Sequence, residues 1–263
     1  MITATSNNQI KNITQLMTKS KVRREQKSYI IEGIRMFLEV PEELVIKAYV
    51  CENSMAETDG RVKKRLESMD YEFVSEKVFK SISGTVTPQG ILAIVKMKEY
   101  SFNELIESSE DRECYMILED IQDPGNLGTI MRTAEATGVK ALIMSKGTVD
   151  IYNPKVIRST MGTIYRVPFI YVENVCDATT TMQKTGIKIV AAHLKGNKWY
   201  DEISYKCKTA FIIGNEGNGI SDELSNKADI LMKIPMEGQV ESLNASVAAS
   251  VLMYEAYRQK KSL

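Results

Sequence analysis

The sequence predicts an α/β protein whose larger part is a parallel sheet flanked by helices. Two observations support this class. From residue 113 onward, apolar runs of strand length alternate with helical patterns, as in parallel sheets whose strands are connected by helices. Residues 1–100 combine a basic helix, a charged helix and a few short apolar runs, which indicates a small mixed α/β unit. We therefore expect domains at residues 1–100 and 113–263, joined by a polar linker at about 101–112.

Local signals support each element of the first domain. Ile10, Ile13 and Leu16 recur at helical spacing, so residues 7–19 are predicted to form a basic amphipathic helix. The remaining predictions are strands at 29–31, 45–51 and 90–97 and a charged surface helix at 59–69.

The second domain alternates strands and helices. Asn126 is expected to cap one helix and Gly138 to end it, because Asn favours helix starts and glycine helix ends. Ser242 is expected to cap the last helix. The predicted strands are 115–118, 141–144, 169–172, 187–192, 210–213 and 230–235, and the predicted helices are 126–137, one starting at 153–154, 175–184 and 242–260.

The charge balance restricts how the chain could bind nucleic acid. Lys+Arg and Asp+Glu both number 34, which excludes a uniformly basic surface but not a local basic patch. Residues 1–31 carry six Lys/Arg against one acid, and residues 138–168 carry five against one. These imbalances allow a phosphate-binding surface. The alternative, that both segments are only solvated faces, stays open.

Cysteine and histidine usage argues against several classes. Cys51, Cys114, Cys176 and Cys207 are far apart and have no metal-ligand spacing, so we expect reduced thiols in a cytoplasmic protein without a metal site. The only histidine, His193, excludes a His-rich metal centre, and no G-x-S-x-G motif accompanies it. A neutral position at a strand end is the simpler expectation for His193. No signal sequence or membrane-spanning run is recognisable.

A first motif lies at the start of the predicted helix 126–137. Gly128 and Arg132 are four residues apart and therefore share one helix face. A glycine one turn before an arginine leaves the guanidinium approachable, and arginine binds phosphate through two hydrogen bonds. A surface pair between Arg132 and Glu135 is the simpler alternative.

A second motif is the glycine loop at residues 214–219, which follows the apolar run 210–213. Its order, G-x-x-G-x-G, differs from the dinucleotide-binding G-x-G-x-x-G, and no P-loop occurs. Glu216, flanked by glycine-rich backbone, is suited to hydrogen bonding with a ligand. A tight turn with a solvated Glu216 is the alternative.

The third motif spans residues 234–246, from Ile-Pro-Met to Ser-Leu-Asn-Ala-Ser. The small residues Ala245, Ser246, Ala248 and Ala249 give the last helix a slim surface that a cofactor or another helix could approach closely. An ordinary buried helix with Leu243 inward is compatible with the same pattern.

Together the three motifs, in this order, resemble the SpoU/TrmH family of RNA ribose methyltransferases in the SPOUT superfamily. The resemblance covers about residues 115–258. A looser similarity links the first domain, through Ser6-Asn7, Ile10-Lys11 and Glu32-Gly33, to the ribosomal-protein-like RNA-binding domain of many members. It implies a catalytic domain with a deep C-terminal trefoil knot, transfer of a methyl group from S-adenosylmethionine to a ribose 2′-hydroxyl, and a homodimer.

The resemblance also assigns roles to residues. The family often assigns Arg132 the role of proton acceptor. Because a guanidinium has no acceptor for a proton, we expect instead that Arg132 binds the target phosphate and stabilises developing alkoxide charge. The expected catalytic residues are Asn126, Arg132, Glu216, Ser242 and Asn244. The expected cofactor-binding residues are Leu194, Gly196, Ile213, Gly214, Glu216, Gly217, Ile234 and Leu243. The expected RNA-binding residues are Lys11, Lys21, Arg23, Arg24, Arg132 and Arg158.

Two other functions stay open from the sequence. One is an RNA-binding module of the same fold without catalysis, and the other is a methyltransferase that modifies a base. Ribosomal RNA is the favoured substrate and transfer RNA the alternative, because a separate binding domain precedes the catalytic one. No membrane partner is expected.

Overall fold

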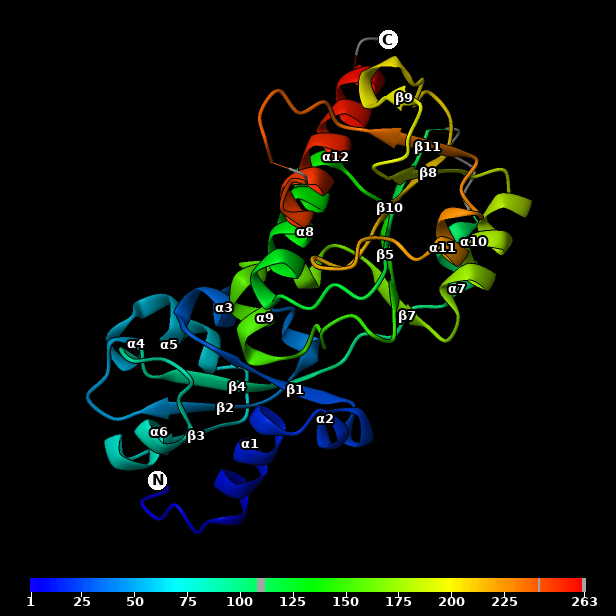
Figure 1. Ribbon diagram of the computed structural model, residues 1–263. Helices are drawn as coiled ribbons and strands as arrows, with labels where there is room; N and C mark the ends of the chain where they lie inside the picture. The colour runs from blue at the N-terminus through cyan, green and yellow to red at the C-terminus, as the bar shows by residue number, and fades with distance from the viewer. Residues whose placement is uncertain (108–111, 241, 262–263) are drawn as a thin grey trace. The chain divides into compact units, whose positions relative to one another are not determined.

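The computed structural model describes residues 1–107, 112–240 and 242–261 (Figure 1). The chain divides into two compact units. The first comprises Met1–Lys98 and Asp150–Tyr165, and the second comprises Glu99–Val149 and Arg166–Leu263. The predicted ranges 1–100 and 113–263 differ from these units by Asp150–Tyr165, which carries α9 (Pro154–Thr160) and packs on the first strand of the first unit.

The first unit is built on a four-stranded sheet of order β1-β4-β2-β3. β4 pairs antiparallel with β1 and β2, whereas β3 runs parallel to β2. Apolar residues of α1 and α6, including the predicted Ile10, Ile13 and Leu16, pack on this sheet. Its elements are α1 (Asn8–Thr18), α2 (Ser20–Gln26), β1 (Ser28–Glu32), α3 (Ile34–Glu39), β2 (Val45–Cys51), α4 (Met55–Thr58), α5 (Gly60–Leu66), β3 (Tyr71–Val74), α6 (Glu76–Ile82) and β4 (Ile91–Lys96).

The second unit is an α/β sandwich, which confirms the predicted class. All neighbouring strands of its seven-stranded sheet are parallel, in the order β7-β6-β5-β10-β8-β11-β9. Figure 1 shows α8 and α12 together on one face and α7, α10 and α11 on the other. The path that would form a knot stays a prediction.

The bounds of these elements agree closely with the sequence patterns. The predicted strand 169–172 and helix 175–184 match β7 and α10. Of the predicted linker, α7 occupies part and residues 108–111 lie outside the described residues. The elements are α7 (Phe102–Ile106), β5 (Cys114–Leu118), α8 (Pro124–Thr137), β6 (Ala141–Ser145), β7 (Phe169–Val172), α10 (Val175–Lys184), β8 (Lys188–Ala192), β9 (Lys198–Trp199), β10 (Thr209–Ile213), α11 (Asp222–Ser225), β11 (Ile230–Lys233) and α12 (Ala245–Lys261).

Two predicted helix caps are wrong. Asp123, not Asn126, caps α8, and its carboxylate accepts a hydrogen bond from the Asn126 backbone N–H at 2.8 Å. α12 begins at Ala245, so Ser242 lies outside the helix, and Asn244 accepts from the Ser246 N–H at 2.9 Å. The predicted end of α8 at Gly138 is confirmed, because Gly138 has the left-handed φ of 69° that glycine adopts readily.

The described residues contain neither a membrane-spanning helix nor a metal-binding cluster. None of their helices combines the length and apolarity needed to span a bilayer. No group of His, Cys, Asp and Glu side chains among them is arranged to hold a metal ion.

Candidate functional site

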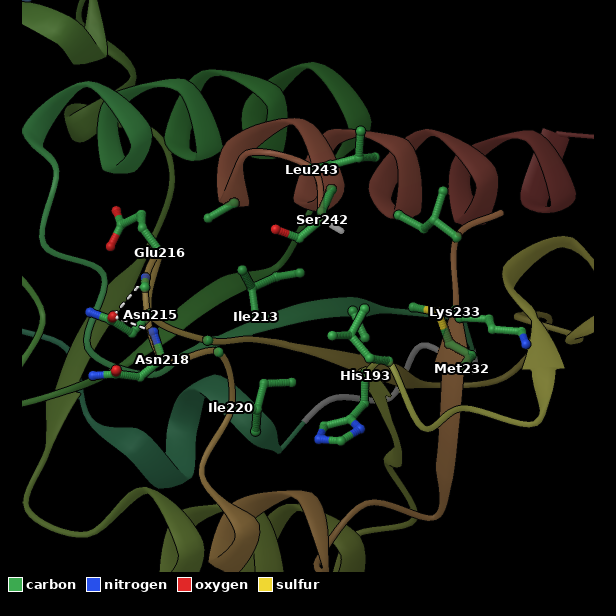
Figure 2. A pocket seen from close by; sticks show the side chains of 18 of the residues that line it. His193, Ile213, Asn215, Glu216, Asn218, Ile220, Met232, Lys233, Ser242 and Leu243 are labelled. Carbon is green, nitrogen blue, oxygen red and sulfur yellow. Dashed lines mark hydrogen bonds between the residues drawn. The ribbon is translucent and has the colours of Figure 1, made fainter. Parts of the chain in front are cut away.

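A pocket of about 340 Å³ lies at the carboxyl ends of β8, β10 and β11. In parallel sheets this edge is where ligands bind, because strand ends and the loops that follow them converge there. Apolar side chains and the start of α12 form much of its wall (Figure 2). Its lining residues are Ala192, His193, Leu194, Ile213, Gly214, Asn215, Glu216, Gly217, Asn218, Gly219, Ile220, Met232, Lys233, Ile234, Met236, Ser242, Leu243, Ala245 and Ala248.

The glycine loop has a backbone geometry that other residues could not adopt unchanged. A Cβ at Gly214 would lie 2.2 Å from the carbonyl carbon of Gly219, because backbone hydrogen bonds between Asn215 and Gly219 hold the two ends of the loop together. Gly219 itself has a φ of 71°. The Asn215 side chain accepts hydrogen bonds from the N–H groups of Gly217 and Asn218 at 2.9 and 3.0 Å. The loop is therefore a rigid wall of the pocket.

Glu216 joins the second motif to the first. Its carboxylate accepts from the Asn126 side chain at 2.9 Å and from the N–H groups of Gln122 and Asp123 at 3.0 and 3.1 Å. Figure 2 shows the carboxylate turned away from Ile213. Burial raises the pKa of Glu216, but these three hydrogen bonds outweigh that effect and hold the pKa below its ordinary value. Glu216 is thus an ionised group that positions the start of α8.

Two further contacts hold the same loops together, and the motifs gave no sign of them. Glu119, at the end of β5, accepts from the Ser221 N–H and hydroxyl, both at 2.7 Å. The Asn215 amide donates to the Asp120 carbonyl at 2.8 Å. Side chains from two loops about a hundred residues apart in sequence therefore fix one geometry.

The third motif supplies the wall opposite the glycine loop. Ser242 and Leu243 line the pocket, as does Ile234 at the end of β11. Asn244 does not, because its side-chain oxygen accepts from the Ser246 N–H and the Ser246 hydroxyl at the helix start. The structure therefore shows Asn244 at the cap of α12, and its predicted catalytic role stays a prediction.

The predicted cofactor-binding set converges on this pocket with one exception. Leu194, Ile213, Gly214, Glu216, Gly217, Ile234 and Leu243 all line it. Gly196 is buried outside it, where a Cβ would approach the Met232 backbone to within 2.5 Å. Its lack of a side chain allows close packing on β11, and the predicted contact of Gly196 with a cofactor stays a prediction.

His193 has a more specific place than the neutral strand-end position expected for it. The residue lines the pocket, and its Nδ1 accepts from the Lys195 N–H at 3.1 Å. In a neutral ring this bond leaves the proton on Nε2, which makes that atom a donor. Its position after β8 was the only sequence signal for such a role.

Arg132 lies on α8 with its side chain exposed. It forms no ion pair with any residue that the structure describes. The pair with Glu135 considered from the sequence does not form, because Glu135 binds Arg166 instead. An exposed, unpaired guanidinium on the helix that Glu216 positions is available to a phosphate.

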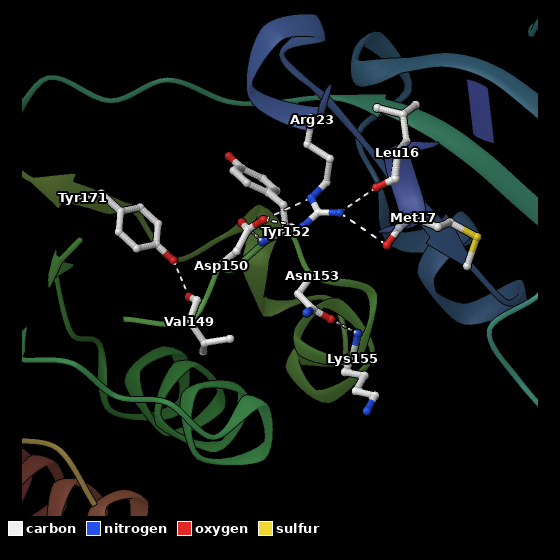
Figure 3. Close-up of polar contacts among 9 residues, drawn as sticks. All are labelled: Leu16, Met17, Arg23, Val149, Asp150, Tyr152, Asn153, Lys155 and Tyr171. Atoms are coloured by element: carbon white, nitrogen blue, oxygen red, sulfur yellow. Dashed lines mark hydrogen bonds and ion pairs between the residues drawn. The ribbon is translucent and has the colours of Figure 1, made fainter. Parts of the chain in front are cut away.

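The structure contradicts the predicted contact of Arg23 with RNA. Its side chain is 4% exposed, and the guanidinium donates to the Leu16 carbonyl at 2.7 Å and to Asp150 at 3.1 Å (Figure 3). A second Nη1 contact reaches the Met17 carbonyl at 3.3 Å. Arg23 therefore joins the end of α1 to the segment that begins at Asp150.

The other predicted RNA-binding residues of the first unit remain accessible. Lys11, Lys21 and Arg24 are exposed, and Arg158 is half-buried on α9. Lys21 makes only a long i,i+4 pair with Glu25, at 3.8 Å between exposed groups. Such a pair contributes little and leaves the ammonium open to a ligand.

Comparison with protein families identifies both parts of the chain. Residues 113–254 match the SpoU rRNA Methylase family, and residues 7–93 match the MRM3-like substrate binding domain. A curated relative is the 23S rRNA (guanosine(2553)-2′-O)-methyltransferase RlmP of Bacillus subtilis (strain 168). It is 32% identical over 254 residues, which cover 96% of this chain and 97% of the relative.

Solved structures give a consistent result over nearly the full length. The AdoMet-bound rRNA methyltransferase from Sinorhizobium meliloti is 28% identical, with a TM-score of 0.85 over 98% of this chain and 97% of that one. The SpoU methyltransferase AviRb from Streptomyces viridochromogenes, in complex with AdoMet, has a TM-score of 0.86 over 97% of this chain and 99% of that one. At 24% identity it supports the fold alone.

Proposed function

This chain belongs to the SpoU rRNA methylase family and is an RNA methyltransferase that uses S-adenosylmethionine, and we propose that it methylates the 2′-hydroxyl of one guanosine in 23S ribosomal RNA. Homology with the Bacillus enzyme over almost the whole length of both chains supports this substrate. The substrate-binding domain at residues 7–93 supports an extended RNA target.

One structural observation carries the proposal: three motifs far apart in sequence converge on one pocket. Glu216 lines the pocket and holds Asn126 at 2.9 Å, while Ser242 and Leu243 approach from the third motif. Each motif alone has a simpler interpretation, as a surface ion pair, a tight turn or an ordinary buried helix. Their convergence at the carboxyl edge of a parallel sheet fits a ligand site.

The pocket suits S-adenosylmethionine in its chemistry. Ile213, Ile234 and Leu243 offer apolar surface to an adenine, and the glycine loop presents backbone polar groups to it. Bound there, the cofactor supplies an electrophilic sulfonium methyl group. The protein must then hold the ribose oxygen in line with that methyl group, and such positioning lowers the barrier substantially.

The residues divide this work according to their partners. The Ser242 hydroxyl lines the pocket and has no hydrogen-bond partner among the described residues, so it is available to orient the ribose hydroxyl. Arg132 binds the neighbouring phosphate and stabilises negative charge that develops on the oxygen. Asn126 and Glu216 are positioning residues, because they bind each other. Water is the final proton acceptor.

We further propose that the active enzyme is a homodimer formed through α12. This helix exposes Val247 and Tyr254, which are 47% and 52% accessible in the single chain. Exposed apolar side chains on a slim helix favour contact with another apolar surface. Replacing both by glutamate should convert a dimer to a monomer in sedimentation velocity. A monomeric wild-type protein at micromolar concentration would contradict the proposal.

Mapping the modified nucleotide tests the proposed activity directly. Deletion of the gene should remove one 2′-O-methylguanosine from 23S ribosomal RNA, and the purified protein should restore it on RNA extracted from the deletion strain. Analysis of the product nucleoside separates ribose from base methylation. Loss of a methyl group from transfer RNA alone, or no loss from any RNA, would refute the ribosomal assignment.

A further inference from the structure

The only tryptophan of the chain, Trp199, lies on the outermost strand of the large sheet. Its residue is 39% exposed, which is unusual for a large apolar side chain. Trp199 is paired in register with Lys233 on β11, and the Lys233 ammonium lies 4.3 Å from the centre of the indole ring. Figure 2 shows the Lys233 side chain extending from β11 toward β9.

Lys233 connects this tryptophan to the cofactor pocket. Lys233 lines the pocket, whereas Trp199 does not. Trp199 therefore lies just beyond the pocket wall, on the other side of Lys233. A group bound at the indole would be a neighbour of whatever occupies the pocket, without competing for the same volume.

Trp199 is surrounded by charges of both signs: Lys195, Lys198 and Lys233, and the acids Asp201 and Glu202 that follow the tryptophan. Lys195 and Lys198 are exposed in the segment that leads to it, and Lys198 projects from the opposite side of β9 because strand residues alternate. Neither they nor Lys233 form an ion pair with any described residue. Of the two acids, Glu202 accepts from the Trp199 N–H at 2.9 Å, and Asp201 is exposed.

We infer that Trp199 and Lys233, with Lys195, form a binding site for an unpaired nucleotide of the substrate RNA, next to the nucleotide that is methylated. A base stacks on the indole, and the adjoining phosphates bind the unpaired lysines. Because it names a further contact with RNA, the inference rests on the proposed function.

Other occupants fit the observations less well. An added peptide strand would need a longer edge than β9, which has two residues. The cofactor already has a pocket that Trp199 does not line. A second copy of the chain would bury the indole but would leave Lys195 and Lys233 without an anionic partner. Single-stranded RNA matches both the exposed aromatic surface and the lysines that have no ion pair among the described residues.

Fluorescence can test the contact without interference, because all tryptophan emission comes from Trp199. Titration with a short single-stranded oligoadenylate should quench this emission to saturation, at the concentration at which labelled oligoadenylate gains anisotropy. RNA binding that leaves the emission unchanged would overturn the inference. So would emission that changes with protein concentration in the absence of RNA, since that result would identify a second copy as the occupant.

Substitutions provide an independent test on ribosomal RNA. Trp199→Ala should raise KM for 23S ribosomal RNA about tenfold, and Trp199→Phe should retain most of the affinity because it keeps an aromatic face. Lys195→Gln should reduce the dependence of RNA affinity on salt by about one counterion. Lys184→Gln, an exposed lysine on α10, is the matched control and should change neither quantity.

The two proposals fail in different ways. If the wild-type protein neither binds S-adenosylmethionine in calorimetry nor methylates ribosomal RNA, the proposed function fails. If the wild-type protein methylates it and Trp199→Ala has unchanged KM and cofactor affinity, only the Trp199 site is refuted. Calorimetry of each variant with the cofactor also shows that the pocket has folded normally.

Discussion

Arg23 in the first unit and Arg132 in the second were both expected to bind RNA, and their surroundings differ completely. Arg23 is buried, and its guanidinium is shared between Asp150 and two backbone carbonyls. Arg132 is exposed on α8 and has no ion-pair partner among the described residues. The same residue type therefore has two functions: one arginine maintains the fold, and the other is available to a ligand.

The difference shows why basic residues in sequence are weak indicators of RNA contact. A buried cation must be paired, since desolvation of an unpaired charge is costly. An exposed unpaired cation adds little to the stability of the fold. Its charge and hydrogen-bond donors are therefore available to bind a phosphate. Burial and partners thus decide between the two functions, and neither can be read from local charge.

The largest expected effect comes from removing the exposed arginine. Arg132→Ala should slow single-turnover methyl transfer about a thousandfold, or about 4 kcal/mol, because the charge on the ribose oxygen loses its stabilising cation. Cofactor affinity and thermal stability should stay unchanged, since Arg132 contacts neither the pocket nor an ion-pair partner.

Arg132→Lys separates charge from geometry. Lysine keeps the charge but loses the planar pair of donors, so less than about a tenth of the rate should remain. If both variants keep the wild-type rate at saturating RNA, Arg132 does not act in the reaction.

The buried arginine should give the opposite pattern. Arg23→Ala should lower the free energy of unfolding by about 2–3 kcal/mol, because it leaves two carbonyls and the Asp150 carboxylate without their donor. Chemical denaturation monitored by circular dichroism measures this loss. Arg24→Ala, the exposed neighbour on α2, is the control and should stay within about 0.5 kcal/mol of wild type. Equal losses of unfolding free energy in both variants would show that Arg23 stabilises the fold no more than its exposed neighbour does.

Sequence patterns predicted the elements well where periodicity was strong. The strand 169–172 and helix 175–184 were recovered to the residue, and most of the predicted cofactor-binding residues line one pocket. These successes share a cause. Strand and helix periods are local, and glycine-rich or capping segments mark strand ends directly.

The failures concern contacts between distant residues. Glu216 binds Asn126 across ninety positions, and Asp150 pairs with Arg23 across 127, so neither can be inferred from neighbours in sequence. β9 is too short to show a period of two. Ser242 was predicted to cap α12, whereas Asn244 does so; both residue types favour the cap position, so the sequence does not distinguish them.

Glu216 positions the helix that carries Arg132, so a substitution at Glu216 tests the role of Arg132 indirectly. Glu216→Gln places an amide donor among the N–H groups that now bind a carboxylate, so turnover should fall about tenfold through misplacement of α8. Asp222→Asn, an exposed residue of α11, should have no such effect.

The pH dependence of stability follows from the lowered pKa of Glu216. A depressed pKa means that the folded state favours the ionised form. The stabilisation is therefore complete above the ordinary value of 4.5 and is lost as the pH falls below it. Wild type and Glu216→Gln should differ in melting temperature at neutral pH and converge in acid. A constant difference from neutral to acid pH would contradict the assigned cause.

The smallest effect is expected at Lys21 in the first unit, an exposed cation whose ion pair with Glu25 is long, at 3.8 Å. Lys21→Gln should weaken RNA binding about two- to threefold and reduce the slope of log affinity against log salt by about one, because one phosphate contact is lost. Lys64→Gln, an exposed lysine on α5, controls for net charge. If the two variants change the slope equally, attraction by overall charge explains the binding. If only Lys21→Gln changes the slope, Lys21 contacts RNA directly. Exposed cations without a strong ion pair are then RNA contacts in both units.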